Sequence, residues 1–148
     1  MALHATYCTR RLTGRVRLLR YGLSYEVGRA VNPRMVHGQL LGGVVQGIGG
    51  ALSEEFRYDH DGIPGSVTLE DYRWPRAGDL PPIQIEVYED SPAPGNPLGV
   101  RGAGEGGVAG VGAAVANAVR SALQLPGTVG ALPLHPARVL DLIDRSAR

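Results

Sequence analysis

One carboxylate in this sequence stands alone within a run of glycines, where it could transfer a proton. Residues 98–107 read LGVRGAGEGG, so Glu105 lies between Gly104 and Gly106. Because glycines carry no side chains, a substrate or cofactor can come close to this carboxylate. A carboxylate beside a reacting atom can act as a general base. The pattern alone leaves two interpretations open: a general base, or an acid that caps a following helix.

The same glycines fit the Gly-x-Gly-x-x-Gly pattern of a dinucleotide-binding turn at Gly102, Gly104 and Gly107. That turn requires a buried strand before it and an acid about 20 residues later. The preceding stretch, PAPGNPLGVR, does not read as a strand, and the next acid after the motif is Asp141. An independent nucleotide-binding module is therefore the weakest of three functional hypotheses.

A glycine-rich helix is predicted upstream, from about Arg34 to Phe56. Its apolar residues recur at helical spacing, and the segment 35–52 contains six glycines. Each glycine disfavours a helix by about 1 kcal/mol relative to alanine. Such a helix is expected only where another helix or a ligand must approach its backbone closely.

The remaining pattern predicts a small sheet. Alternation of basic and apolar residues from Gly14 predicts a strand, and strict alternation from Ile83 predicts another. A further strand followed by an irregular loop is expected in 65–82. A helix is predicted at 108–125, and a shorter one begins at Pro136. We therefore expect a mixed α/β fold, a small sheet with two main helices, in which residues 1–148 form a single domain.

Composition limits the classes of partner. The net charge is +1 and 43% of the 148 residues are hydrophobic, which favours neither nucleic acid nor a membrane. The uncharged run 35–52 is too rich in glycine and amide side chains to predict a membrane span. A single cysteine, Cys8, excludes an internal disulfide framework. No apolar run typical of a signal peptide occurs near the N-terminus, so a cytoplasmic location is expected.

Several ordered motifs resemble one family. The likeness is carried by five stretches: the upstream GRAVNPRMVHGQLLGGVVQGIGGALSEEFRYDHDG and DYRWPRAGDLP, then NPLGVRGAGEGG and the following GVGAAVANAVRSAL, and the closing PLHPARVLDLI. Together they resemble the C-terminal segment of the molybdopterin-binding catalytic subunit of the molybdenum hydroxylases, which include xanthine dehydrogenase, aldehyde oxidase and aerobic carbon monoxide dehydrogenase. The resemblance covers 14–143. One departure is 24–26, Ser-Tyr-Glu, because acids usually precede the Gly-Arg-x-x-Asn-Pro turn in the family.

The resemblance implies roles for named residues. Glu105 occupies the position of the glutamate that acts as the active-site base in the family. Gln46 matches the glutamine that contacts the pterin cofactor. Gly47, Gly102 and Gly104 are implied as positions where the backbone approaches that cofactor. Molybdenum is held by the pterin in this family, so no metal ligand from the protein is expected.

The resemblance also implies a function. The chain would be part of an oxidoreductase that hydroxylates an aldehyde, an N-heterocycle or a similar small substrate at a molybdenum–pterin centre. The cofactor is expected in its cytosine dinucleotide form. Iron–sulfur clusters and FAD are expected on partner subunits, with the remainder of the molybdopterin-binding subunit as a further partner. The isolated chain is expected to be inactive. The alternative is a non-catalytic fragment or assembly piece that retains the fold without binding cofactor alone.

Overall fold

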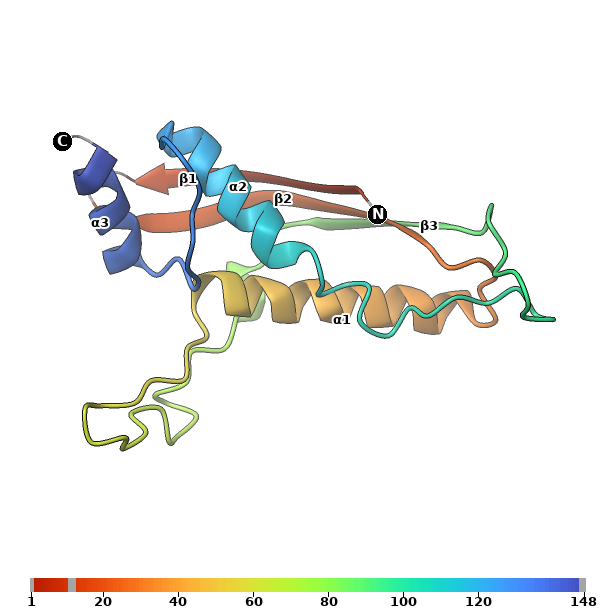
Figure 1. Ribbon diagram of the computed structural model, residues 1–148, viewed down its shortest axis with the longest axis horizontal. Coiled ribbons are helices and arrows are strands. Elements are labelled where there is room, and N and C mark those ends of the chain that lie inside the picture. Colours follow the sequence, from red (N-terminus) through yellow and green to blue (C-terminus); the bar gives the residue numbers. More distant parts are fainter. Residues whose placement is uncertain (1, 11–12, 147–148) are drawn as a thin grey trace.

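The fold is a three-stranded mixed sheet with helices packed against it (Figure 1). The computed structural model describes residues 2–10 and 13–146, with the backbone alone for 2–10. Strand β1 (Ala2–Arg10) pairs antiparallel with β2 (Arg15–Glu26), and β2 pairs parallel with β3 (Ile83–Tyr88). The central strand β2 therefore connects the two halves of the sheet.

Helix α1 (Pro33–Leu52) links the parallel strands β2 and β3, which need such a crossover. The helix begins where the Asn32 side chain accepts a hydrogen bond from the Met35 backbone N–H at 3.2 Å. It ends four residues before the predicted limit near Phe56. The backbone N–H groups of residues 53 and 54 both donate to the Gly49 carbonyl, at 2.9 and 2.8 Å, and close the helix.

Two further helices follow the glycine loop. Helix α2 (Val111–Leu123) and helix α3 (Pro136–Ser146) lie where the sequence predicts them. A short 3₁₀ turn, η1 (Ala77–Asp79), precedes β3. The expected fold class, a mixed α/β arrangement with a small sheet and α1 and α2 as its main helices, is confirmed. Among the helices of the described chain, none has the length and apolar character to cross a membrane.

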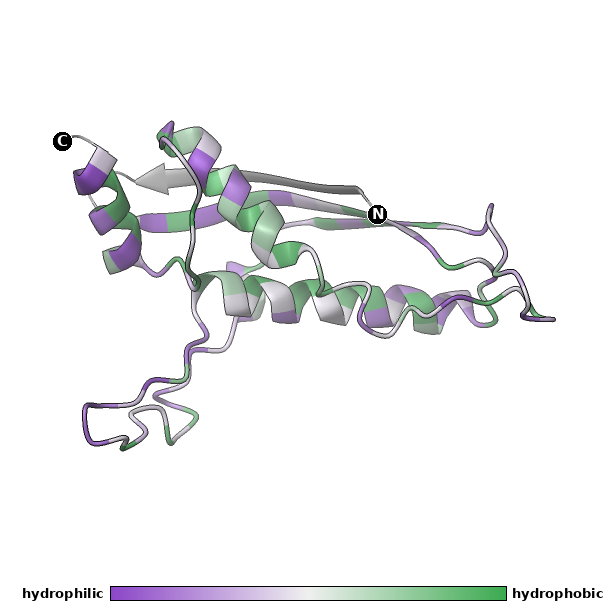
Figure 2. Cartoon of the chain, viewed as in Figure 1, coloured by the Kyte–Doolittle hydropathy of each residue, from purple (hydrophilic) through white to green (hydrophobic). Residues whose placement is uncertain are grey.

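The core lies between the helices and one face of the sheet (Figure 2). Side chains alternate along β3 between half-buried and exposed, as a strand with one covered face requires. Most of the fully buried side chains come from the central strand and the three helices. They include Tyr21, Leu23, Leu40, Val44, Val111, Val115, Val119 and Val139.

Tyr21 is the polar exception in this core. Its side chain is 1% exposed, and its hydroxyl has no hydrogen-bond partner among the described residues. Burial raises the pKa of this hydroxyl to about 12. Because an unsatisfied buried hydroxyl disfavours folding, Tyr21→Phe is expected to raise the free energy of unfolding by about 1 kcal/mol. Urea denaturation of both chains measures this, and a loss of stability in Tyr21→Phe would contradict it.

Two expectations about the strands need correction. Strand β1 was not predicted, although Leu3, Ala5 and Tyr7 alternate with more polar residues. The strand predicted within 65–82 is wrong, because this segment consists of turns, bends and η1. Thr68 accounts for part of the difference: its side chain and carbonyl accept hydrogen bonds from the backbone of residues 71 and 72, which folds the chain into a turn.

Residues 53–76, which we call the arm, extend away from the sheet and helices (yellow and green, lower left of Figure 1). Internal hydrogen bonds shape it. The Tyr72 hydroxyl donates to Glu54 at 3.1 Å, and Asp59 accepts from two backbone N–H groups. At the base of the arm, Arg138 of α3 pairs with Glu55 at 3.5 Å. Six large apolar side chains of the arm are nevertheless more than half exposed: Phe56, Tyr58, Ile63, Val67, Leu69 and Trp74.

Candidate functional site

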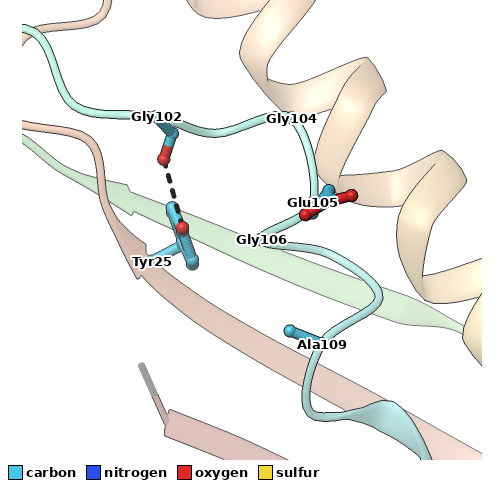
Figure 3. A pocket seen from close by; sticks show the side chains of 6 residues that line it. All are labelled: Tyr25, Gly102, Gly104, Glu105, Gly106 and Ala109. Atoms are coloured by element: carbon cyan, nitrogen blue, oxygen red, sulfur yellow. Dashed lines mark hydrogen bonds between the residues drawn. The ribbon is translucent and has the colours of Figure 1, made fainter.

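Glu105 lies in the loop that joins β3 to α2, at an open cleft of about 540 Å³. Figure 3 shows this cleft and the residues that line it, which are Tyr25, Gly102, Gly104, Glu105, Gly106 and Ala109. The Glu105 side chain is exposed. Among the side chains and backbone of 13–146, no hydrogen bond or ion pair engages its carboxylate. The carboxylate is therefore available to a ligand, and this chain alone does not remove it from water.

The helix-cap interpretation of Glu105 is wrong. The residue that caps the N-terminus of α2 is Gly110, and no side chain makes a capping hydrogen bond there. What Glu105 contributes to the local backbone is its carbonyl, which accepts from the Val108 and Ala109 N–H groups at 3.1 and 3.2 Å. A turn therefore separates Glu105 from the helix. The general-base interpretation stays a prediction.

The glycine loop is held from two sides. From α1, the Gln39 side-chain amide donates to the Gly104 carbonyl at 2.8 Å. From β2, the Tyr25 hydroxyl donates to the Gly102 carbonyl at 3.2 Å. At the start of the loop, the Arg101 guanidinium donates to the carbonyl and hydroxyl of Ser91, at 2.6 and 3.0 Å. These contacts fix the backbone around Glu105.

Close packing against α1 explains part of the glycine content. A Cβ atom on Gly43 would lie 2.8 Å from Gly107 Cα and 2.9 Å from the Val108 nitrogen. A Cβ atom on Gly107 would collide with the Leu40 carbonyl oxygen. The loop backbone therefore lies directly on the helix backbone at this crossing, as the six glycines of the predicted helix suggest.

The predicted cofactor-contact residues fall in different surroundings. Gly102 and Gly104 line the cleft with Glu105. Gly47 faces α2, because a Cβ atom there would lie 2.5 Å from Val111 Cβ, so helix packing already requires a glycine at this position. Gln46 is exposed on α1 and does not line the cleft. No group of three or more His, Cys, Asp or Glu side chains in the described part of the chain could hold a metal ion.

Tyr25 and Gln39 contact the glycine loop near Glu105, and the sequence did not predict either contact. Gln39 lies seven residues before Gln46, so the two amides share one face of α1. That spacing was the available signal for Gln39. Tyr25 is 77 residues from its partner Gly102, and no local pattern predicts such a contact.

Glu26 stabilises the turn at the end of β2. Its carboxylate accepts hydrogen bonds from the Gly28 N–H at 2.7 Å and the Asp90 N–H at 3.1 Å. Burial opposes its charged form. Hydrogen bonds from three backbone N–H groups and the charge of Arg101 outweigh that effect, so the pKa of Glu26 lies below its usual value. This acid ties the turn after β2 to the loop after β3.

A pH dependence follows from the lowered pKa of Glu26. The stability that this carboxylate contributes is fully present above the ordinary glutamate pKa of about 4.3. It is lost as the pH falls through the lower pKa of the folded state. The Tm of Glu26→Gln is therefore expected to fall less than that of the unchanged chain below about pH 4. Thermal unfolding followed from neutral to acidic pH measures this, and parallel curves for the two chains would contradict it.

Comparisons with known proteins show which family the chain resembles. Residues 8–81 match the family described as molybdopterin cofactor-binding domain. The chain is 42% identical over 127 residues to the 6-hydroxypseudooxynicotine dehydrogenase complex subunit gamma of Paenarthrobacter nicotinovorans, covering 86% of this chain and 16% of that one. It is 38% identical to the nicotine 6-hydroxylase large subunit of the same organism, covering 87% of this chain and 16% of that one.

Solved structures extend the agreement to the fold. Quinoline 2-oxidoreductase from Pseudomonas putida 86 superposes with a TM-score of 0.83 at 34% identity, covering 90% of this chain and 17% of that one. The chain thus spans about one sixth of the length of the relatives it matches. The chain belongs to the molybdopterin cofactor-binding domain family, as a segment of the xanthine dehydrogenase and aldehyde oxidase type.

Proposed function

We propose that this chain forms the C-terminal part of the catalytic subunit of a molybdenum hydroxylase. The observation that carries the proposal is an exposed carboxylate, Glu105, held in a fixed glycine loop at an open cleft. The substrate class would be an aldehyde, an N-heterocycle or a similar small molecule. The cytoplasmic location stays a prediction.

The outer face of α1 fits a large organic cofactor. Gly38, Gly42, Gln46 and Gly50 follow one another at intervals of four residues and therefore share a face. A Cβ atom on any of the three glycines would meet no described atom within 4 Å. Packing within the chain therefore does not require glycine there, whereas close approach by a pterin cofactor would. Gly102 and Gly104 are open in the same way.

Each residue of the site has a defined part in this proposal. Bound molybdenum–molybdopterin, in its cytosine dinucleotide form, supplies the two-electron oxidation chemistry. Glu105 accepts a proton through its carboxylate oxygens, and the cleft beside Gly102 and Gly104 admits the substrate. Gln46 donates its amide hydrogens to the cofactor. Iron–sulfur and FAD subunits, provided by other chains, would accept the electrons that this chemistry releases.

The arm supports the remainder of the molybdopterin-binding subunit as a partner. Apolar side chains such as Phe56, Leu69 and Trp74 are 55%, 76% and 58% exposed on a segment with internal hydrogen bonds. Apolar clusters of this kind mark surfaces that another protein segment covers. Coverage of the cleft by the same partner would remove Glu105 from water.

The molybdenum content of the chain purified from its native host tests the proposal. Elemental mass spectrometry measures the metal, and protein mass spectrometry identifies what co-purifies. Near-stoichiometric molybdenum together with larger partner subunits would support a working enzyme assembled from several chains. A chain without molybdenum and without partners would instead be the non-catalytic fragment, and the proposal would fail. The chain on its own is expected to show no hydroxylase turnover.

A further inference from the structure

Tyr25 contacts the glycine loop on both sides of Glu105. Its hydroxyl donates to the carbonyl of Gly102, three residues before Glu105, at 3.2 Å. Its ring lies against Gly106, the next residue after Glu105, so that a Cβ atom on Gly106 would collide with the ring. Figure 3 shows the Tyr25 side chain directed from β2 toward Gly102, with Glu105 on the same loop. One aromatic side chain therefore restrains the backbone before and after the carboxylate.

The strand that carries Tyr25 is well anchored. Tyr25 pairs with Val87 in the parallel ladder between β2 and β3. The next residue, Glu26, binds the backbone N–H groups of Gly28 and Asp90. A side chain on such a strand holds its partner more accurately than one on a mobile loop. The sheet, through Tyr25, thus sets the position of the loop.

The loop has little conformational restraint of its own. Five of the ten residues in 98–107 are glycines, which have the widest choice of backbone conformations. Gln39 restrains the Gly104 carbonyl from α1 and does not reach Gly102 or Gly106. Without the Tyr25 hydroxyl, the Gly102 carbonyl loses its side-chain partner, and the direction of Glu105 becomes less defined.

We propose that Tyr25 is a positioning residue that fixes Glu105 for proton transfer. This inference rests on the proposed function, since it concerns the same carboxylate. The hydroxyl acts through the loop and does not itself exchange a proton with substrate. Misplacement of a reacting group by about 1 Å can lower a rate by roughly 10²-fold. Tyr25→Phe keeps the ring against Gly106 and removes only the hydrogen bond to Gly102.

The first measurement uses the chain itself. The backbone N–H groups of Val108 and Ala109 donate hydrogen bonds within the loop, and that of Arg101 donates to the Val27 carbonyl just after β2. Their exchange with deuterium therefore reports on loop opening. Tyr25→Phe is expected to accelerate that exchange about 2–10-fold, as loss of one hydrogen bond predicts. The matched control is Tyr88→Phe, which removes a hydroxyl bound to Glu86 on the exposed face of β3. The control is expected to leave the loop unchanged.

The second measurement uses the assembled molybdenum enzyme. Tyr25→Phe is expected to lower kcat by about 10–100-fold, with KM and molybdenum content unchanged. Unchanged exchange in the loop, or faster exchange with an unchanged kcat, would overturn the positioning role. An equal change in KM and kcat would also overturn it. Full activity of Glu105→Gln would overturn the proposed function and the positioning role together, whereas full activity of Tyr25→Phe alone overturns only the latter.

Discussion

Replacement of Glu105 by glutamine is expected to lower kcat of the assembled molybdenum enzyme by about 10²–10⁴-fold. Glutamine keeps the size of the side chain but cannot accept the proton. The variant is expected to fold normally, because the Glu105 side chain is exposed and engages no described residue. Its molybdenum content is expected to match that of the unchanged enzyme, which separates a loss of chemistry from a loss of cofactor.

Steady-state kinetics with a substrate of the host enzyme measure this effect. The matched control is Asp144→Asn, the same change from carboxylate to amide at an exposed acid on α3 that does not line the cleft. The control should retain full turnover. If the two variants had the same kcat, Glu105 would not be the base, whatever cofactor the enzyme contained.

Alanine at Gly43 and alanine at Gly42 are expected to change stability in opposite directions. A Cβ atom on Gly43 would press on the backbone of Gly107 and Val108, which cannot rotate away. Overpacking of this kind destabilises a fold by about 1–3 kcal/mol. A Cβ atom on Gly42 meets nothing within 4 Å, so alanine there should stabilise the helix by roughly 1 kcal/mol.

Urea denaturation of the two variants gives both free energies of unfolding. The pair is well matched, since the residues are adjacent in α1 and undergo the same substitution. Two shifts of the same sign would show that the loop does not lie on the helix at this crossing. Opposite shifts would support the contact between α1 and the glycine loop on which the position of Glu105 depends.

The elements with strong periodicity were predictable from the sequence. The helix around Val44 and the strand from Ile83 carry patterns that only one secondary structure satisfies. The incorrect strand within 65–82 has a different origin. Its apolar residues Val67 and Leu69 alternate as in a strand, but in this chain they are exposed on the arm. Such alternation predicts a strand with one buried face, and this chain alone does not bury these residues.

The site was only partly predictable. Glu105 could be singled out as a candidate because its glycine neighbours are contiguous in the sequence, and its role as a base stays a prediction. Tyr25 and Gln39 could not, since they reach the loop across 77 and 65 residues. The glycines of α1 look alike in the sequence, yet Gly43 faces the loop and Gly42 faces open space. Only the three-dimensional position of the loop before α2 shows which glycines of α1 are packed against it and which are open.

The open glycines on the outer face of α1 have an evolutionary consequence. Alanine at Gly38, Gly42 and Gly50 would together stabilise the helix by roughly 3 kcal/mol, and a single base change converts a glycine codon into an alanine codon. In a lineage released from selection for activity, drift should therefore replace these glycines quickly. If a cofactor contacts this face of α1, selection for activity would instead oppose that replacement. The order in which related sequences lose these glycines would date the loss of catalysis in any lineage that has abandoned it.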